Sequence, residues 1–154
     1  MSVAYFDTSA LLKHYMTEIG SSWVNAVLAA ADAPAVFTSH LALVETTCSF
    51  ARRLRDKTIT VSAHTQSVAA FDYDVTYRYK IVDVMPQTID AARQLASRHP
   101  LRAYDAMHRA TACLLNQELL DTGKSPLIFV SADDRLLAIA QAESLPTDNP
   151  NHHP

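Results

Sequence analysis

The sequence predicts an α/β fold in which helices cover both faces of a parallel sheet. Several short runs are continuously apolar rather than alternating, which is typical of strands buried on both faces. Segments with helical spacing separate these runs, as crossover helices between parallel strands do. The chain has 154 residues, of which 49% are hydrophobic, so it can build one core and is too short for two ordinary domains. We therefore expect one three-layer α/β/α domain over residues 1–150, followed by a short disordered tail at 151–154.

Each predicted strand is an apolar run that a polar or turn-forming residue ends. The first run is stopped by Asp7-Thr-Ser9, after which helical spacing begins. The predicted strands are residues 3–6, 36–38, 81–84 and 127–130.

The predicted helices fill the segments between these strands. Pro100 separates two of them, because proline cannot continue a helix. The predicted helices are residues 10–16, 20–28, 41–57, 61–73, 87–98, 103–120 and 134–142. In the third of them, one stripe is expected to face the core, and it consists of Leu41, Val44, Cys48, Ala51 and Leu54.

Composition excludes several classes of protein. Only two glycines are present, Gly20 and Gly123, so neither a phosphate-binding P-loop nor a dinucleotide fingerprint exists. The two cysteines, Cys48 and Cys113, lack zinc-ligand spacing and are expected to be buried, reduced thiols. The net charge of −3 means that any contact with phosphates must come from a local positive patch.

The N-terminus has no basic segment followed by a long apolar stretch. No window approaches the roughly 18 apolar residues that a membrane span needs. We therefore expect a cytoplasmic protein without a membrane segment.

Four acidic residues stand where they could converge. Asp7 and Asp133 each follow a predicted strand, where an aspartate is also a common helix N-cap. Asp105 lies in the first turn of its helix, and Glu45 lies beside the predicted buried stripe, where a carboxylate needs a partner. In parallel sheets, ligands bind beyond the carboxyl ends of the strands. Carboxylates within about 4–6 Å of one another favour a cation, and an acid-only site suits one or two Mg²⁺ ions, or Mn²⁺, acting on phosphate esters.

Four ordered segments resemble the motifs of PIN-domain ribonucleases, specifically VapC-type toxins of type II toxin–antitoxin systems. They are Tyr5-Phe-Asp-Thr-Ser-Ala-Leu-Leu-Lys13, Leu43-Val-Glu45, Leu101-Arg-Ala-Tyr-Asp-Ala106 with His108 and Ala110-Thr-Ala112, and Phe129-Val-Ser-Ala-Asp-Asp-Arg-Leu136.

The resemblance implies a metal site formed by Asp7, Glu45, Asp105 and Asp133. It implies that the Ser9 and Ser131 hydroxyls hold the carboxylates or metal-bound water of this site. Whether Asp134 assists Asp133 stays open. It also implies a parallel five-stranded sheet with a last strand near residues 145–147, a homodimer, and an antitoxin partner. The implied activity is endonucleolytic hydrolysis of RNA by metal-activated water, which leaves 5′-phosphate and 3′-hydroxyl ends.

The RNA contacts must come from scattered basic residues. Several basic residues cluster at the C-terminal end of one helix, where the helix dipole stabilises cations whether or not they bind RNA. The candidates are Arg52, Arg53, Arg55, Lys57, Lys13, Arg102 and Arg109. Lys13 and Arg102 lie closest in sequence to the acidic motifs, so we predict that these two contact RNA.

Two functions other than hydrolysis are compatible with an acidic pocket at the ends of parallel strands. A phosphoacceptor signalling domain needs a lone aspartate after the third strand, where this chain has Met85-Pro86. A catalytically silent PIN-like domain that binds RNA or a protein partner remains an alternative, although all four acids are present.

Overall fold

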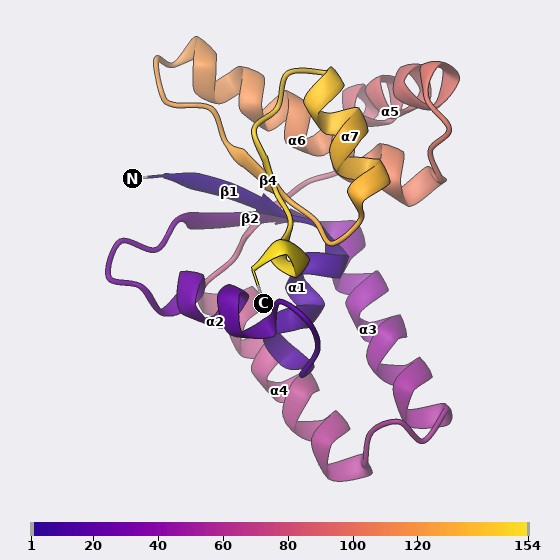
Figure 1. Ribbon diagram of the computed structural model, residues 1–154. Helices are drawn as coiled ribbons and strands as arrows, with labels where there is room; N and C mark the ends of the chain where they lie inside the picture. Colours follow the sequence, from indigo (N-terminus) through magenta and orange to yellow (C-terminus); the bar gives the residue numbers. More distant parts are fainter. Residues whose placement is uncertain (1, 154) are drawn as a thin grey trace.

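Five parallel strands form the central sheet of the computed structural model, which describes residues 2–153 (Figure 1). The strands are β1 (Val3–Phe6), β2 (Ala35–Ser39), β3 (Lys80–Val82), β4 (Ile128–Val130) and β5 (Thr147–Asp148). Their order in the sheet is β3-β2-β1-β4-β5, and every neighbouring pair is parallel. The expected parallel five-stranded sheet is confirmed, with β1 at its centre.

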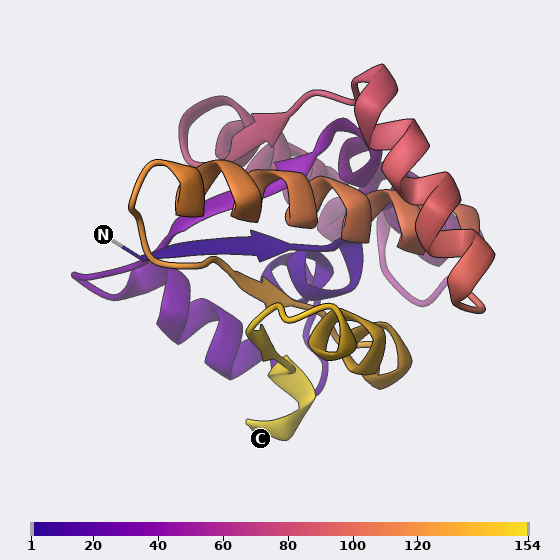
Figure 2. The same ribbon diagram turned by 90° about the horizontal axis from the view of Figure 1, so that it is seen from above.

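Seven helices connect the strands. They are α1 (Thr8–Tyr15), α2 (Ser21–Ala29), α3 (His40–Arg55), α4 (Val61–Tyr77), α5 (Pro86–Arg98), α6 (Ala103–Asp121) and α7 (Asp134–Ala142). Helices α1, α2 and α4 lie on one face of the sheet, and α6 and α7 lie on the other, with α5 packed on α6 (Figures 1 and 2). Between residues 2 and 153, no helix combines the length and the apolarity needed to cross a membrane.

The side chains of β1 divide the core into two layers. Ala4 and Phe6 pack on one face with Leu11 of α1, whereas Tyr5 packs on the other face with Phe129. This alternation follows from the twofold periodicity of a strand. Because both faces of the strand are covered, the three-layer α/β/α architecture predicted from the apolar runs is confirmed.

Helix α3 corrects one prediction. Its buried residues are Ala42, Thr46 and Phe50, which pack toward α1 and α4. Val44, which was expected in the core, has 59% of its surface exposed, and Cys48 is an exposed free thiol rather than a buried one. Some apolar residues of this helix therefore face the core, and others lie at the surface beside Glu45.

The end of the chain is ordered, which corrects the expected disorder for residues 151–153. Residues Pro150–His152 form a 3₁₀ helix, and the ring of His153 stacks on Trp23 with 4.5 Å between centroids. His153 also lies 2.7 Å from a carboxylate oxygen of Asp148. Gly20 has a positive φ of 83°, and a Cβ at this position would collide with the backbone of Pro150. The tail is thus packed against the start of α2; Pro154 lies outside the described residues.

Candidate active site

The pairing of β1 with β4 brings two predicted site segments together. Asp7 follows β1 directly, and Ser131 and Asp133 follow β4. The backbone N–H of Asp7 donates to the carbonyl of Val130 at 3.1 Å, which extends the ladder to the end of the strands. Both segments therefore lie at the carboxyl edge of the sheet, where ligands bind in folds of this class.

Asp7 is held in place from two sides. Its Oδ1 accepts hydrogen bonds from the hydroxyl of Ser9 at 2.7 Å and from the N–H of Ala10 at 2.9 Å, so it also caps α1. Its Oδ2 accepts from the hydroxyl of Ser131 at 2.6 Å. Burial raises the pKa of Asp7 above its usual value, although nearby His108 and these hydrogen bonds oppose the rise. The carboxylate is thus oriented while its charge remains incompletely compensated.

Glu45 projects from α3 into a second hydrogen-bonded group. Its Oε2 accepts from the hydroxyl of Thr8 at 2.6 Å and lies 2.6 Å from Nε2 of His108. Since a carboxylate only accepts, Nε2 carries the proton, and Nδ1 can then accept from the hydroxyl of Tyr5 at 2.9 Å. Burial alone would raise the pKa of Glu45, but the hydrogen bonds from His108 and Thr8 outweigh it and hold this pKa below its usual value.

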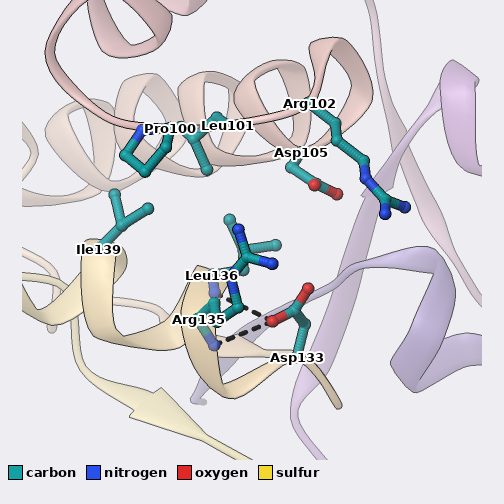
Figure 3. A pocket seen from close by; sticks show the side chains of 8 residues that line it. All are labelled: Pro100, Leu101, Arg102, Asp105, Asp133, Arg135, Leu136 and Ile139. Atoms are coloured by element: carbon teal, nitrogen blue, oxygen red, sulfur yellow. Dashed lines mark hydrogen bonds between the residues drawn. The ribbon is translucent and has the colours of Figure 1, made fainter.

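Asp105 and Asp133 face a hollow of about 90 Å³ at the rim of the site (Figure 3). Asp133 caps α7 by accepting from the N–H groups of Arg135 at 2.9 Å and Leu136 at 3.2 Å. Burial raises the pKa of Asp105, and the negative charges of Asp133, Asp7 and Glu45 raise it further, with only Arg102 acting against them. The charges of the other three predicted acids therefore all reach Asp105 at this edge of the sheet.

The donor set suits a hard divalent cation, because it consists of carboxylate oxygens with hydroxyl support and includes no thiolate. Across residues 2–153, no group of three or more His, Cys, Asp or Glu side chains lies close enough together to hold a metal ion by itself. An open arrangement is compatible with Mg²⁺, which uses one or two carboxylates and keeps several waters or phosphate oxygens. Asp7, Asp105 and Asp133, with Glu45 beside them, are the residues that would hold such an ion.

Asp134 points away from this site. Its Oδ1 accepts from the side-chain amide of Asn149 at 2.6 Å and lies 3.3 Å from Nε2 of His152. Its side chain is 70% exposed, on the side of α7 that carries the C-terminal segment. Of the two adjacent aspartates, only Asp133 faces the other acids.

The two predicted RNA contacts differ in their surroundings. Lys13 is buried, and its ammonium donates to the carbonyl of Ile19 at 2.6 Å and pairs with Glu18 at 3.2 Å. This position does not favour a contact with RNA, because the cation is already used to hold the loop after α1. Arg102, in contrast, is exposed and lies beside Asp105 at the hollow. The other candidate Arg109 is fully buried and donates to Cys113 and to the carbonyl of Ala140.

Three residues of the site were not predicted as functional, namely Thr8, His108 and Arg135. Thr8 and His108 both lie within the motif segments, and His108 is three residues after Asp105, on the same face of α6. That spacing was the available signal for His108. Arg135 follows the Asp133–Asp134 pair, and nothing in its spacing distinguished it from a solvated residue in the first turn of α7.

The comparisons with known proteins agree with this fold. Residues 4–142 match the model of the PIN domain family. Ribonuclease VapC45 of Mycobacterium tuberculosis (strain CDC 1551 / Oshkosh) is 31% identical over 142 residues, which cover 92% of each chain. The chain therefore belongs to the PIN-domain family and, within it, to the VapC-type proteins.

Solved structures share the fold at low sequence identity. FitAcB from Neisseria gonorrhoeae superposes with a TM-score of 0.68 at 14% identity, covering 97% of this chain and 99% of the other. A toxin–antitoxin complex from Klebsiella pneumoniae gives a TM-score of 0.62 at 16% identity, covering 96% and 97%. At these identities the structures support the fold alone.

Proposed function

We propose that this protein is a Mg²⁺-dependent endoribonuclease that hydrolyses RNA phosphodiester bonds and acts as the toxin of a toxin–antitoxin pair. The observation that carries the proposal is the gathering of acids at the carboxyl edge of the sheet. Asp105 and Asp133 line one hollow there, and the charges of Asp133, Asp7 and Glu45 all raise the pKa of Asp105. Such a cluster is stabilised by a divalent cation, and a phosphate ester is the substrate that adds oxygen ligands to that cation. The similarity to a relative named as a ribonuclease supports RNA as the substrate.

Two of the four acids are oriented by hydrogen bonds, and the other two line an open hollow. Asp7 is fixed by Ser9 and Ser131, and Glu45 is fixed by Thr8 and His108, so both carboxylates present a set direction to a ligand. Asp105 and Asp133 line the open hollow. When bound, Mg²⁺, or Mn²⁺ in its place, as one or two ions, would supply positive charge for the phosphate and lower the pKa of water near it.

The chemistry that follows is attack of water on phosphorus. The bond between phosphorus and the 3′ oxygen breaks, and the leaving oxygen takes up a proton. The products are therefore a 5′-phosphate and a 3′-hydroxyl. Arg102 stands where its guanidinium can neutralise charge on the phosphate, because it is exposed beside Asp105.

The proposed biological setting includes a cognate antitoxin and a homodimer of this chain in the cytoplasm. The fold shared with a chain from a solved toxin–antitoxin complex supports the antitoxin. An antitoxin would act by covering the acidic hollow.

The experiment compares the parent chain with Asp7→Asn. Asparagine keeps an oxygen that can accept from Ala10, so the cap of α1 survives while the negative charge is lost. We expect expression of the parent alone to arrest growth, and the purified parent to cleave RNA with Mg²⁺ but not with EDTA, leaving 5′-phosphate ends. Asp90→Asn, which removes an exposed acid from α5, is the matched control and should behave like the parent.

Two outcomes would overturn the proposal. Equal toxicity of the parent and Asp7→Asn, without metal-dependent cleavage by either, would favour the catalytically silent PIN-like domain. Products with 2′,3′-cyclic phosphates would show that the RNA 2′-hydroxyl attacks instead of water.

A further inference from the structure

A second hollow, lined by other residues than the one in Figure 3, also adjoins the acids. It measures about 430 Å³ and is lined by Thr8 and Glu45 at one end and by Arg52 and Arg55 of α3 farther along, with Tyr104 also in its wall. Thr8 and Glu45 belong to the acidic site, and Tyr104 immediately precedes Asp105 on α6. The groove therefore leads directly into the acids rather than forming a separate pocket.

The arginines other than the fully buried Arg109 fall into two groups. Arg53, Arg78, Arg93 and Arg98 each form an ion pair, with Glu18, Asp74, Asp90 and Glu143 respectively. The other group forms no ion pair anywhere in the part of the chain that the structure describes, and it consists of Arg52, Arg55, Arg102 and Arg135.

The members of the second group are the arginines that line the two hollows beside the acids. Arg52 and Arg55 line the groove along α3, and Arg102 and Arg135 line the hollow between α6 and α7 (Figure 3). These four guanidinium groups are thus available for an anionic ligand that reaches the acids from either side.

The groove along α3 also presents apolar and aromatic surface. Tyr104 is 52% exposed and Val44 is 59% exposed, and both lie in its wall. Exposed aromatic rings beside cations suit a single-stranded nucleic acid, because bases stack on the ring while phosphates contact the guanidinium groups. A duplex is less suitable, since its bases are stacked on one another and cannot reach a side chain in this way.

We propose that single-stranded RNA crosses the acidic site along a track of unpaired arginines, from Arg52 and Arg55 on one side to Arg102 and Arg135 on the other, with a base stacked on Tyr104. This inference rests on the proposed function and assigns the substrate path of the same site. It also explains how a chain with a net charge of −3 binds a polyanion, because the positive charge is gathered along the path.

The first test measures RNA binding without cleavage. A fluorescein-labelled, single-stranded oligoribonucleotide is titrated with protein in EDTA at several salt concentrations, and binding is followed by anisotropy. Each phosphate contact contributes about 0.7 to the slope of log K against log salt for a single strand. Replacing Arg52 and Arg55 together by glutamine should therefore reduce the slope by about 1.4, and the double change Arg102→Gln and Arg135→Gln should do the same. Arg93→Gln removes one arginine that is paired on α5, and it should leave the slope unchanged.

Tyr104→Leu separates stacking from charge. It should weaken binding at least about fivefold, the equivalent of roughly 1 kcal/mol of stacking, without changing the salt slope. A double arginine variant with the slope of the parent would overturn the track. So would unchanged affinity of both double arginine variants for the oligoribonucleotide, because the arginines would then not contact RNA. Failure of cleavage with these binding results intact would count against the proposed function alone.

The native cysteines give a second test that needs no variant. Cys48 is exposed and lines the groove, whereas Cys113 is half-buried against Arg109 on α6. We expect saturating oligoribonucleotide to slow alkylation of Cys48 severalfold, measured by mass spectrometry, and to leave the rate at Cys113 unchanged. An unchanged rate at Cys48 would overturn the proposal.

Discussion

Replacing His108 tests whether the hydrogen-bonded group around Glu45 stabilises the fold as well as the site. The imidazole is buried and links the hydroxyl of Tyr5, at 2.9 Å, to the carboxylate of Glu45, at 2.6 Å. His108→Ala removes the side chain that both Tyr5 and Glu45 contact, and it leaves a void between β1 and α6. Glu45 keeps the hydroxyl of Thr8, whereas Tyr5 loses its partner. One buried polar group left unsatisfied costs about 1–3 kcal/mol and the void adds to this cost, so we expect the free energy of unfolding to fall by at least that amount.

The matched variant is His108→Gln. The glutamine amide has both a donor for Glu45 and an acceptor for Tyr5, so this variant should lose less than about 1 kcal/mol. Urea unfolding followed by circular dichroism measures the free energy of unfolding of both variants. An unchanged m-value would show that the same surface is exposed on unfolding as in the parent. If His108→Ala and His108→Gln unfold at the same urea concentration as the parent, the group does not stabilise the fold and the reasoning fails.

Three further changes probe charge, support and packing. Asp105→Asn should stabilise the metal-free chain slightly, by well under about 1 kcal/mol because water screens this partly exposed group. The pKa of Asp105 is higher in the folded than in the unfolded chain, so its protonation stabilises the fold. This stabilisation is complete below the unfolded pKa and is lost as the pH rises through the folded pKa. The metal-free parent should therefore lose stability over this pH range, and the variant should not. A variant less stable than the parent in urea at neutral pH would contradict this. Ser131→Ala removes a hydroxyl 2.6 Å from Asp7 and should weaken Mn²⁺ binding by about 10–100-fold in calorimetry, whereas unchanged affinity would separate Asp7 from the metal. His153→Ala removes the stacking on Trp23 and should cost about 0.5–1.5 kcal/mol, with faster hydrogen exchange at the start of α2; unaltered exchange would mean that the tail does not stabilise this end.

Much of the fold can be predicted because the buried strands have an obvious pattern. The continuously apolar runs located β1, β2 and β4 to within two residues and indicated parallel pairing. In helix α3, apolar spacing alone does not identify the buried positions. Its apolar positions follow helical spacing whether they face the core or a groove, so Val44 and Cys48 could not be distinguished from Ala42 and its buried neighbours.

The motif segments indicated the four acids and the two hydroxyls, Ser9 and Ser131, that donate to Asp7. They did not indicate which side chains contact Glu45. His108 and Glu45 are 63 residues apart in the chain and meet only because α6 and α3 converge at one edge of the sheet. The burial of Lys13 likewise depends on the path of the loop after α1, which places the carbonyl of Ile19 against its ammonium. Such contacts are properties of the tertiary structure, and the spacing of His108 from Asp105 does not reveal that its partner is Glu45.

The central claim is that the four carboxylates together hold a divalent cation, and Mn²⁺ binding measured by electron paramagnetic resonance tests it most directly. Asp133→Asn and Asp134→Asn form a matched pair, because the residues are adjacent and only Asp133 faces the other acids. We predict that the parent and Asp134→Asn bind Mn²⁺ with equal affinity, and that Asp133→Asn and Asp105→Asn bind at least about tenfold more weakly. Equal affinity in all four proteins would contradict the account.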